Sequence, residues 1–441
     1  MLPCHGRDHG FKSRRPRTKN QMIKNSYDIL KERGFVNQTT DEAHIKQLLS
    51  KQKVNFYIGF DPTASSLHVG SLVGLMAAAH LQNQGHKPII LVGGGTGLVG
   101  DPSGKDKARP IMNRQEIAKN ALALKKQISK IVDFSAKGGS ASGGKNSQAI
   151  LVNNADWLAK LNYIEFLRDF GTHFSVNRLL NSESVKIRLE KGLSFLEFNY
   201  QLLQAYDFWH LFKTKNCVLQ LGGSDQWGNI VAGVELVRRL EEKEAYGITI
   251  PLITTSDGKK MGKTEKGAVW LDAKLTSPYE YYQFWINTDD ADTARFLLLF
   301  TFLPVKEIEK LKKLKGAEIK RAKEVLAFEA TKILHGEKEA RKAAEASAAL
   351  FGNENKKVDS VPAITVNKKE FRNGITASKI FVLAGLVKSS GEAYRLIAQG
   401  GGYLNEKRLD NPNLLITEKD FSNGELILRS GKKKYKKIKL L

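Results

Sequence analysis

The sequence predicts an α/β fold of the doubly wound, Rossmann-like type, a mainly parallel sheet with helices on both faces. Helical patterns alternate with short strand patterns from Ser26 to about Thr255. Two of the strands, Pro88–Val92 and Cys217–Leu221, are mostly apolar, as expected for strands that are covered on both faces. A long helix-forming region follows the sheet, and a small basic α+β unit ends the chain.

The order of the elements follows from apolar spacing and from turn residues. Val54–Phe60 alternates as a strand that ends at the Asp61-Pro62 break, and Gly138–Ser147 is a Gly/Ser-rich loop. Helices are expected at Ser26–Lys51, Leu67–Asn83 and Arg114–Phe134. The expected parts of the chain are a basic extension without folded structure (1–25), the sheet domain (26–255, with an insertion at about 133–195), a helical domain (256–352), a linker (353–365) and the basic unit (366–441).

The chain has a strong and uneven positive charge. Lysine and arginine number 70 against 46 acidic residues, a formal net charge of +24. Residues 1–25 hold seven Lys/Arg and one acid, and residues 366–441 hold sixteen and seven. Such a surface favours a polyanionic partner, most commonly nucleic acid, and a lysine-rich surface without a partner is the alternative.

Several other classes of protein are disfavoured. No apolar run reaches the ~18 residues of a membrane span, so no membrane partner is expected. The two cysteines, Cys4 and Cys217, cannot form a disulfide framework, which favours a reducing, cytoplasmic compartment. Neither has a Cys or His partner at metal-ligand spacing, so no protein metal site is expected.

A glycine-rich turn follows the strand Pro88–Val92. Residues Gly95–Gly100 match the G-x-G-x-x-G pattern of dinucleotide-binding folds. That function requires a helix that begins within the motif, but the turn Asp101-Pro102-Ser103-Gly104 follows. The Walker A pattern fails as well, because Gly104-Lys105 is followed by Asp106. We interpret the glycines as a tight turn that a ligand approaches closely.

Two further segments have groups that suit phosphate. His68 lies near the start of an expected helix, where backbone N–H groups and an imidazole can face an anion. Lys260 and Lys263 lie on a short basic loop. Alone, each has an ordinary interpretation, a helix cap for His68 and a solvated turn for the lysines. Together they suggest one site that binds a triphosphate from two sides.

In order and spacing, six segments resemble the bacterial-type tyrosyl-tRNA synthetases: Tyr57–Thr63, His68–Gly70, Gly97–Lys105, Tyr200–Phe208, Gln220–Asn229 and Lys260–Thr264. The resemblance covers roughly residues 26–441 and includes an S4-like RNA-binding module at the C-terminus. His68–Ser71 is similar to the HIGH signature of class I synthetases, and Lys260–Thr264 to their KMSKS signature. Ser71 stands where the first signature usually has a second histidine, although a hydroxyl can still donate to phosphate.

The resemblance implies a two-step reaction. Tyrosine and ATP give tyrosyl-adenylate and pyrophosphate, and the tyrosyl group then passes to the 3′-terminal adenosine of tRNA(Tyr). No protein nucleophile is required, so catalysis rests on positioning and on donors aimed at phosphate charge. Mg²⁺ is expected with the ATP, held mainly by the phosphates. The implied donors are His68, Ser71, Lys105, Arg109, Lys260, Lys263 and Thr264.

The same resemblance assigns the substrate contacts. Tyr57 and Asp207 would contact the phenolic hydroxyl of tyrosine, although an ordinary strand aromatic and a helix-surface acid are the alternatives. The other implied tyrosine-binding residues are Asp101, Tyr200 and Gln204, at the α-ammonium group, and Gln220. The adenylate side would be lined by Gly59, Asp61, Thr63, Gly70, Gly223, Asp225, Gln226 and Lys263.

The resemblance also implies partners. The insertion would form a homodimer interface, which its apolar residues suit, and an insertion packed on its own subunit is the alternative. RNA, and not DNA, is the expected polyanion. A non-catalytic RNA-binding protein is disfavoured by the nearly intact nucleotide motifs, and a tryptophanyl-tRNA synthetase by the hydroxyl-binding pair. The apolar residues are Trp157, Leu158, Phe166, Leu167 and Phe170, and the expected RNA-binding lysines are Lys432, Lys433, Lys434, Lys436 and Lys437.

Overall fold

The structure is a computed structural model of the chain. It describes residues 25–103, 112–135, 147–181, 183–256, 258, 261, 263–264, 267–351, 363–372, 374–405, 407–431 and 434–441. Several predictions lie outside these ranges: residues 1–24, most of Gly138–Ser147, Lys105, Arg109, Lys260, Lys432 and Lys433. For Lys263, Thr264 and Lys434 only the backbone is described.

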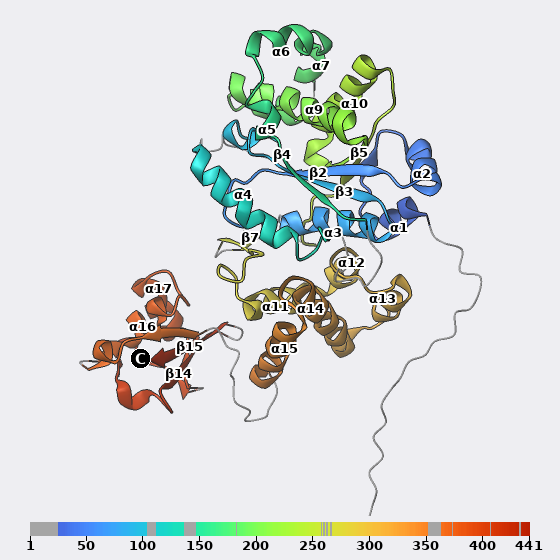
Figure 1. Cartoon of the computed structure of the whole chain (residues 1–441). Coiled ribbons are helices and arrows are strands. Elements are labelled where there is room, and N and C mark those ends of the chain that lie inside the picture. The colour runs from blue at the N-terminus through green and yellow to red at the C-terminus, as the bar shows by residue number, and fades with distance from the viewer. Residues whose placement is uncertain are drawn as a thin grey trace, which may run out of the picture.

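A six-stranded sheet forms the centre of the larger part of the molecule (Figure 1). In spatial order its strands are β1 (Gln38–Thr39), β6 (Tyr246–Ile250), β5 (Cys217–Gly223), β2 (Asn55–Phe60), β3 (Lys87–Val92) and β4 (Ile150–Asn153). All neighbouring strands are parallel except the short edge strand β1. The strand order reverses at β2, between β3 and β5, and a crevice at such a switch point is the usual ligand site of an open α/β sheet.

Helices cover both faces of this sheet (Figure 1), as predicted. Alternate residues of β2 point to opposite faces, so Phe56 and Ile58 join the core beneath α3, whereas Tyr57 packs with Phe208 of α9. Because these three residues of β2 are all buried, the strand does not show the alternating burial that the sequence suggested. The helices of this region are α1 (Ser26–Glu32), α2 (Glu42–Lys51), α3 (Val69–Asn83), α4 (Arg114–Ile128), α9 (Phe195–Lys215) and α10 (Trp227–Glu241).

Three predicted boundaries need correction. The helical pattern Ser26–Lys51 is divided into α1 and α2, because Gly34 adopts φ 83° and reverses the chain between them. The helix from Arg114 ends at Ile128 rather than at Phe134. The insertion begins later than residue 133, because β4 pairs with β3 as part of the main sheet. The remaining insertion contains α5 (Ala155–Leu158), α6 (Tyr163–Asp169), α7 (Val176–Leu180) and α8 (Glu183–Leu189).

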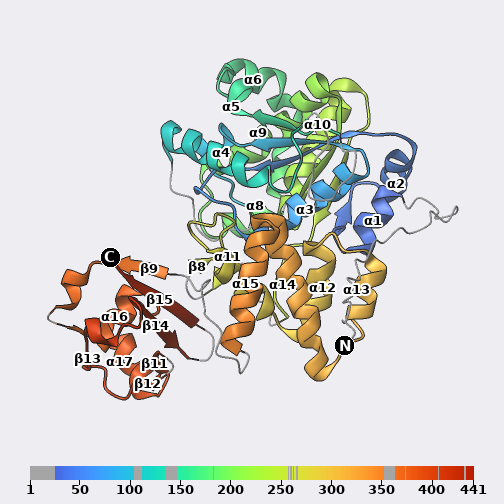
Figure 2. The ribbon, with the colours of Figure 1, turned by 60° about the horizontal axis from the view of Figure 1, so that its bottom comes forward.

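A group of helices lies beneath the sheet domain (Figure 2). They are α11 (Pro278–Ile286), α12 (Asp290–Phe300), α13 (Val305–Leu311), α14 (Ile319–His335) and α15 (Glu337–Phe351). Their apolar residues share one hydrophobic core with α1 and α3. The buried guanidinium of Arg33 fixes this arrangement, because it donates to the carbonyls of Leu298 and Thr301, each at 3.0 Å, at the end of α12. Burial lowers the pKa of Arg33 to about 10.

The C-terminal unit has its own hydrophobic core. Its main sheet has the order β12 (Lys407–Arg408), β11 (Gly402–Leu404), β14 (Glu425–Ser430), β15 (Lys434–Leu440) and β9 (Ala363–Val366). The unit also contains α16 (Ala377–Leu383), α17 (Ser390–Ala398) and the paired strands β10 (Ile375–Thr376) and β13 (Leu415–Ile416). Residues 363–365, predicted as linker, belong to β9, because Ile364 and Val366 pack onto this core.

Candidate active site

A cavity of about 280 Å³ lies at the carboxyl ends of β2 and β5, at the switch point of the sheet. Most of the predicted substrate residues line it. They are Tyr57, Gly59, Asp61, Gly70, Ser71, Asp101, Tyr200, Gln204, Asp207, Gln220, Gly223, Asp225 and Gln226. Two other predicted site residues, Thr63 and His68, are exposed and do not line the cavity.

One part of the cavity wall is made of buried polar groups with unused hydrogen-bonding capacity. The hydroxyl of Tyr57 and Oε1 of Gln220 are buried without a hydrogen-bond partner among the described residues. Asp207 of α9 is 2% exposed and lies in the same wall. A buried unpaired polar group is costly, so these atoms suit a ligand that brings a hydroxyl.

The carboxylate of Asp207 is bound by two donors from the insertion. Nδ2 of Asn154 donates to Oδ2 at 2.9 Å, and the indole Nε1 of Trp157 donates to Oδ1 at 2.7 Å. Both bonds favour the charged form, but burial outweighs them and raises the pKa of Asp207 to about 7. Burial and the nearby Asp207 also raise the pKa of Tyr57 well above its usual value.

A second group of acceptors lies around Asp101. Nε2 of Gln226 donates to Oδ2 of Asp101 at 2.8 Å, and the backbone N–H of Ser103 donates to Oδ1 at 2.9 Å. Burial, followed by the charge of Asp61, raises the pKa of Asp101 to about 6. The hydroxyl of Tyr200 donates to Asp61 Oδ2 at 2.9 Å. A substrate ammonium group would relieve the repulsion between the two carboxylates.

The residues that connect the polar groups around Asp207 with those around Asp61 and Asp101 were not identified from the sequence. Nδ2 of Asn154 donates to both Asp207 and Oγ1 of Thr96, and Thr96 donates to Oδ1 of Asp61 at 2.8 Å. Asn154 directly follows β4, a strand that was not predicted. Trp157, expected at a dimer interface, instead points inward and stacks on His210 with ring centroids 4.4 Å apart.

The first signature segment begins helix α3. His68 is the N-cap residue, and its Nδ1 accepts the backbone N–H of Gly70 at 3.0 Å. In a neutral ring the proton is therefore on Nε2, which leaves that atom as a donor. A side chain at position 70 would place its Cβ 2.7 Å from Cε1 of His68, so any residue other than glycine would displace the imidazole.

The second signature segment is connected to the first through the backbone. Lys263 and Thr264 form β7 (Lys263–Thr264), which pairs with β8 (Gly267–Ala268). The next residues run antiparallel to the start of α3: Val69 N–H donates to the carbonyl of Val269, and His68 pairs with Trp270. Residues that follow the lysine segment thus lie beside the start of α3, although the two stretches are far apart in the sequence.

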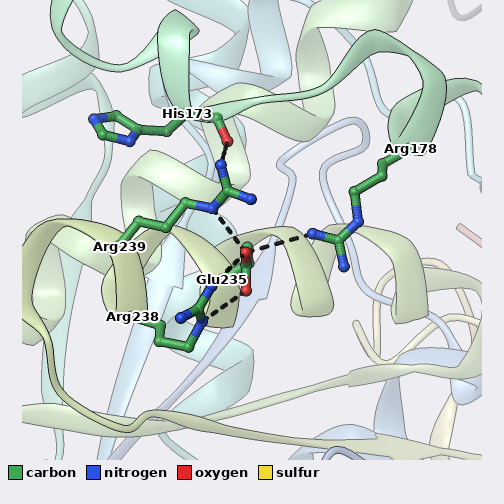
Figure 3. A network of polar contacts seen from close by, with 5 residues as sticks. All are labelled: His173, Arg178, Glu235, Arg238 and Arg239. Atoms are coloured by element: carbon green, nitrogen blue, oxygen red, sulfur yellow. Dashed lines mark hydrogen bonds and ion pairs between the residues drawn. The ribbon is translucent and has the colours of Figure 1, made fainter.

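A network of charged groups connects the insertion to α10 (Figure 3). Glu235 accepts Nε of Arg239 at 2.7 Å and Nη2 of Arg238 at 2.9 Å, and it forms an ion pair with Arg178 at 3.4 Å. Arg239 also donates to the backbone carbonyl of His173 at 3.1 Å. The adjacent arginines hold the pKa of Glu235 at about 2, so this carboxylate stays charged.

Two predictions about surfaces change with the structure. Phe166 and Phe170, expected at an interface, pack against Tyr206 within the same chain. Lys437, expected to contact RNA, is 2% exposed and pairs with Glu425 at 2.7 Å, so it is not available to a phosphate backbone. Lys436 is partly exposed, and its Nζ lies 3.9 Å from Glu280 of α11.

The parallel sheet with a cavity at its switch point is the fold of the class I tRNA synthetases. Residues 49–352 match the family model described as tRNA synthetases class I (W and Y), and residues 353–438 match the tyrosine–tRNA ligase SYY-like C-terminal domain. A tyrosine–tRNA ligase of Clostridium botulinum is 53% identical over 416 residues, 94% of this chain and 99% of that protein. One of Acetivibrio thermocellus is 53% identical over 415 residues. The chain belongs to the tyrosine–tRNA ligase family.

Solved structures agree with this assignment. A C-terminally truncated mitochondrial tyrosyl-tRNA synthetase of Aspergillus nidulans matches with a TM-score of 0.67 and 34% identity, over 74% of this chain and 94% of that one. A tyrosyl-tRNA synthetase of Archaeoglobus fulgidus, solved with L-tyrosine, matches with a TM-score of 0.53 over 72% of this chain and 99% of that one. At 19% identity this second likeness shows the fold alone. Among the described helices we find none with the length and apolarity needed to span a bilayer.

Proposed function

We propose that the chain activates tyrosine with ATP to give tyrosyl-adenylate and pyrophosphate, and then transfers the tyrosyl group to the 3′-terminal adenosine of tRNA(Tyr). The observation that most supports the choice of amino acid is the buried polar wall formed by Asp207, Tyr57 and Gln220. A phenol can donate to the Asp207 carboxylate and accept from the Tyr57 hydroxyl. A side chain without a hydroxyl would leave the buried Tyr57 hydroxyl and Gln220 Oε1 unpaired.

The remaining contacts of the amino acid orient its carboxylate. Asp101, Tyr200 and Gln204 supply acceptors for the α-ammonium group. With both ends of tyrosine bound, its carboxylate can be held for an in-line attack on the α-phosphate, and the activation then depends mainly on positioning.

The phosphates would be bound by donors from both signature segments. Nε2 of His68 and the hydroxyl of Ser71 lie at the start of α3, where the helix dipole also favours negative charge. Lys105, Arg109, Lys260, Lys263 and Thr264 are proposed as the remaining donors. Gly59, Asp61, Thr63, Gly70, Gly223, Asp225 and Gln226 are proposed on the adenylate side.

Mg²⁺ is proposed to arrive with the nucleotide. Asp61 and Asp101 in the cavity already accept hydrogen bonds from protein donors. In the described part of the chain, no three His, Cys, Asp or Glu residues cluster as a metal site. An ion held by phosphate oxygens and water fits these residues better than an ion held in a protein cage.

The proposed partners are a second copy of this chain and tRNA(Tyr), in the cytoplasm, where ATP and tRNA are available. The insertion exposes large apolar side chains, among them Ile164 (71% exposed) and Val176 (58%), which a homodimer would cover. The C-terminal unit would bind tRNA through its basic residues, with Lys437 removed from the predicted set. Sedimentation velocity tests the dimer.

The activity itself is tested by ATP–pyrophosphate exchange with each amino acid in turn. We expect exchange with tyrosine and Mg²⁺, and at most weak exchange with phenylalanine or tryptophan. Exchange that responds to tryptophan and not to tyrosine would overturn the proposal, and so would no exchange with any amino acid.

A further inference from the structure

The segment that leads to Lys263 is held by a helix that contributes nothing to the cavity. After β6 the chain runs from Pro251 to Ser256, and Met261 returns to it, because Met261 N–H donates to the carbonyl of Ile253 at 2.8 Å. The side chain of Met261 is buried in the main core. We call residues 251–256, together with Met261, the neck. Lys263 follows two residues after Met261, so the position of its backbone depends on how the neck is held.

Asp292 of α12 binds this neck directly. Its side chain is 4% exposed, and Oδ2 accepts the backbone N–H of Ser256 at 2.7 Å. Oδ1 accepts Nη2 of Arg295 at 2.8 Å, and the same guanidinium donates to the carbonyl of Thr254. A pair of side chains one helical turn apart thus holds both a donor and an acceptor of the neck backbone.

Helix α12 is itself fixed at its other end. The last carbonyls of α12 and those just after it accept the buried guanidinium of Arg33, and Phe296 and Leu297 lie in the core shared with α3. Asp292 therefore connects the lysine segment to a rigid frame, and this frame includes α3, the helix that His68 begins. A charge-assisted hydrogen bond from a backbone N–H to a buried carboxylate is among the stronger means of fixing a backbone position.

We propose that Asp292, supported by Arg295, is a positioning residue for the second signature segment: it sets where Lys263 lies relative to His68 and so the rate of adenylate formation. Asp292 does not line the cavity, and it acts only through the backbone that it binds. This inference rests on the proposed function, because the rate in question is that of tyrosine activation.

The test compares Asp292→Ala with a matched control, Asp290→Ala. Asp290 lies on the same helix but is exposed and pairs with Lys323. In pyrophosphate exchange we expect Asp292→Ala to lower the maximal rate about tenfold, with tyrosine KM changed less than twofold, and Asp290→Ala to change both less than twofold. A rise in tyrosine KM with an unchanged rate, or equal effects of the two variants, would overturn the proposal.

A double variant separates positioning from general destabilisation. If Asp292 acts through Lys263, then Asp292→Ala combined with Lys263→Ala should be within about twofold of Lys263→Ala alone. If the rate reductions of the two single variants multiply in the double variant, Asp292 acts independently of the lysine. If Asp292→Ala does not fold, Arg295→Gln decides, because Arg295 is half exposed and its loss should lower the rate at least threefold with tyrosine KM unchanged.

Hydrogen exchange supplies a measurement that does not depend on activity. Peptides that cover residues 253–261 should exchange at least tenfold faster in Asp292→Ala than in wild type and in Asp290→Ala. If hydrogen exchange in Asp292→Ala is the same as in wild type, Asp292 does not hold the neck, even if the enzyme is active. If Asp292→Ala exchanges faster than wild type but the wild-type protein has no tyrosine-dependent activity, the role of Asp292 in holding the backbone stands and the proposed reaction is wrong.

Discussion

Discrimination between tyrosine and phenylalanine should depend on pH, with a midpoint near 7. Asp207 has a pKa of about 7 because it is buried, so it is largely neutral at pH 6 and largely charged at pH 8.5. The charged carboxylate accepts a stronger hydrogen bond from a phenol than the neutral acid does. It is also less tolerant of a phenyl ring, which offers no donor. Both effects raise the preference for tyrosine as the pH increases.

The size of the effect follows from hydrogen-bond energies. A hydrogen bond to a charged group contributes roughly 1.5–3 kcal/mol and a neutral one roughly 0.5–1.5 kcal/mol, a difference of about 1 kcal/mol. Since 1.4 kcal/mol is a factor of about ten, the ratio of kcat/KM for tyrosine to that for phenylalanine should rise about fivefold between pH 6 and pH 8.5. Asp101, with a pKa of about 6, faces the ammonium group that both amino acids share, so its titration cancels in the ratio.

Pyrophosphate exchange at several pH values with both amino acids measures this ratio, and kcat/KM reports the ionisation of the free enzyme. Asp207→Asn should give a lower ratio that does not vary with pH. A ratio that is flat in wild type would refute the assigned role of Asp207. A pH dependence that persists in Asp207→Asn would assign the titration to another group.

Three other predictions follow from the site and the domains. Tyr57→Phe should reduce the discrimination against phenylalanine by about 1 kcal/mol, because a buried hydrogen-bond partner is lost; an unchanged kcat/KM ratio would remove Tyr57 from the hydroxyl contact. Lys263→Ala should lower the adenylation rate about tenfold or more while tyrosine affinity, measured by equilibrium dialysis, barely changes; a large loss of affinity at a normal rate would contradict this. A chain ending at Phe351 should still form tyrosyl-adenylate, because every proposed chemical residue precedes residue 266. It should lose most tRNA charging and most of the salt dependence of tRNA binding. Normal charging by this shorter chain would mean that the C-terminal unit does not bind the tRNA.

The sequence was sufficient to predict a mainly parallel sheet and its strands β2, β3 and β5, although not β4. Motif residues such as Asp61 and Gln226 lie next to strand ends, and the carboxyl ends of parallel strands converge at one edge, so their meeting in one cavity follows from the fold class. Asn154 and Thr96 were not predicted, because their role depends on contacts between segments that the sequence keeps apart. No local pattern distinguishes a buried asparagine of this kind from an ordinary turn residue.

The lysine run near the C-terminus shows a second limit of sequence reasoning. Adjacent residues of a strand point to opposite faces, so Lys436 and Lys437 of β15 cannot both follow one phosphate backbone. A charge count treats them alike, whereas the structure buries Lys437 against Glu425 and leaves Lys436 partly exposed. The pairing of β15 with β14 places Glu425 opposite Lys439 and so on the same face as Lys437, which is information that a charge count lacks.

Trp157 of the insertion donates to Asp207 in the proposed tyrosine pocket, so a substitution at this position tests whether the insertion affects that pocket. Its indole N–H favours the charged form of Asp207, so Trp157→Phe should raise the pKa of Asp207 further above 7 while the ring can still stack on His210. The midpoint of the tyrosine-to-phenylalanine ratio should then move to higher pH. The matched control is Trp209→Phe on α9, whose indole N–H donates instead to Glu241 at 2.7 Å. It should leave the midpoint in place. If both variants shift the midpoint equally, or if neither does, the hydrogen bond from Trp157 does not set the charge state of Asp207.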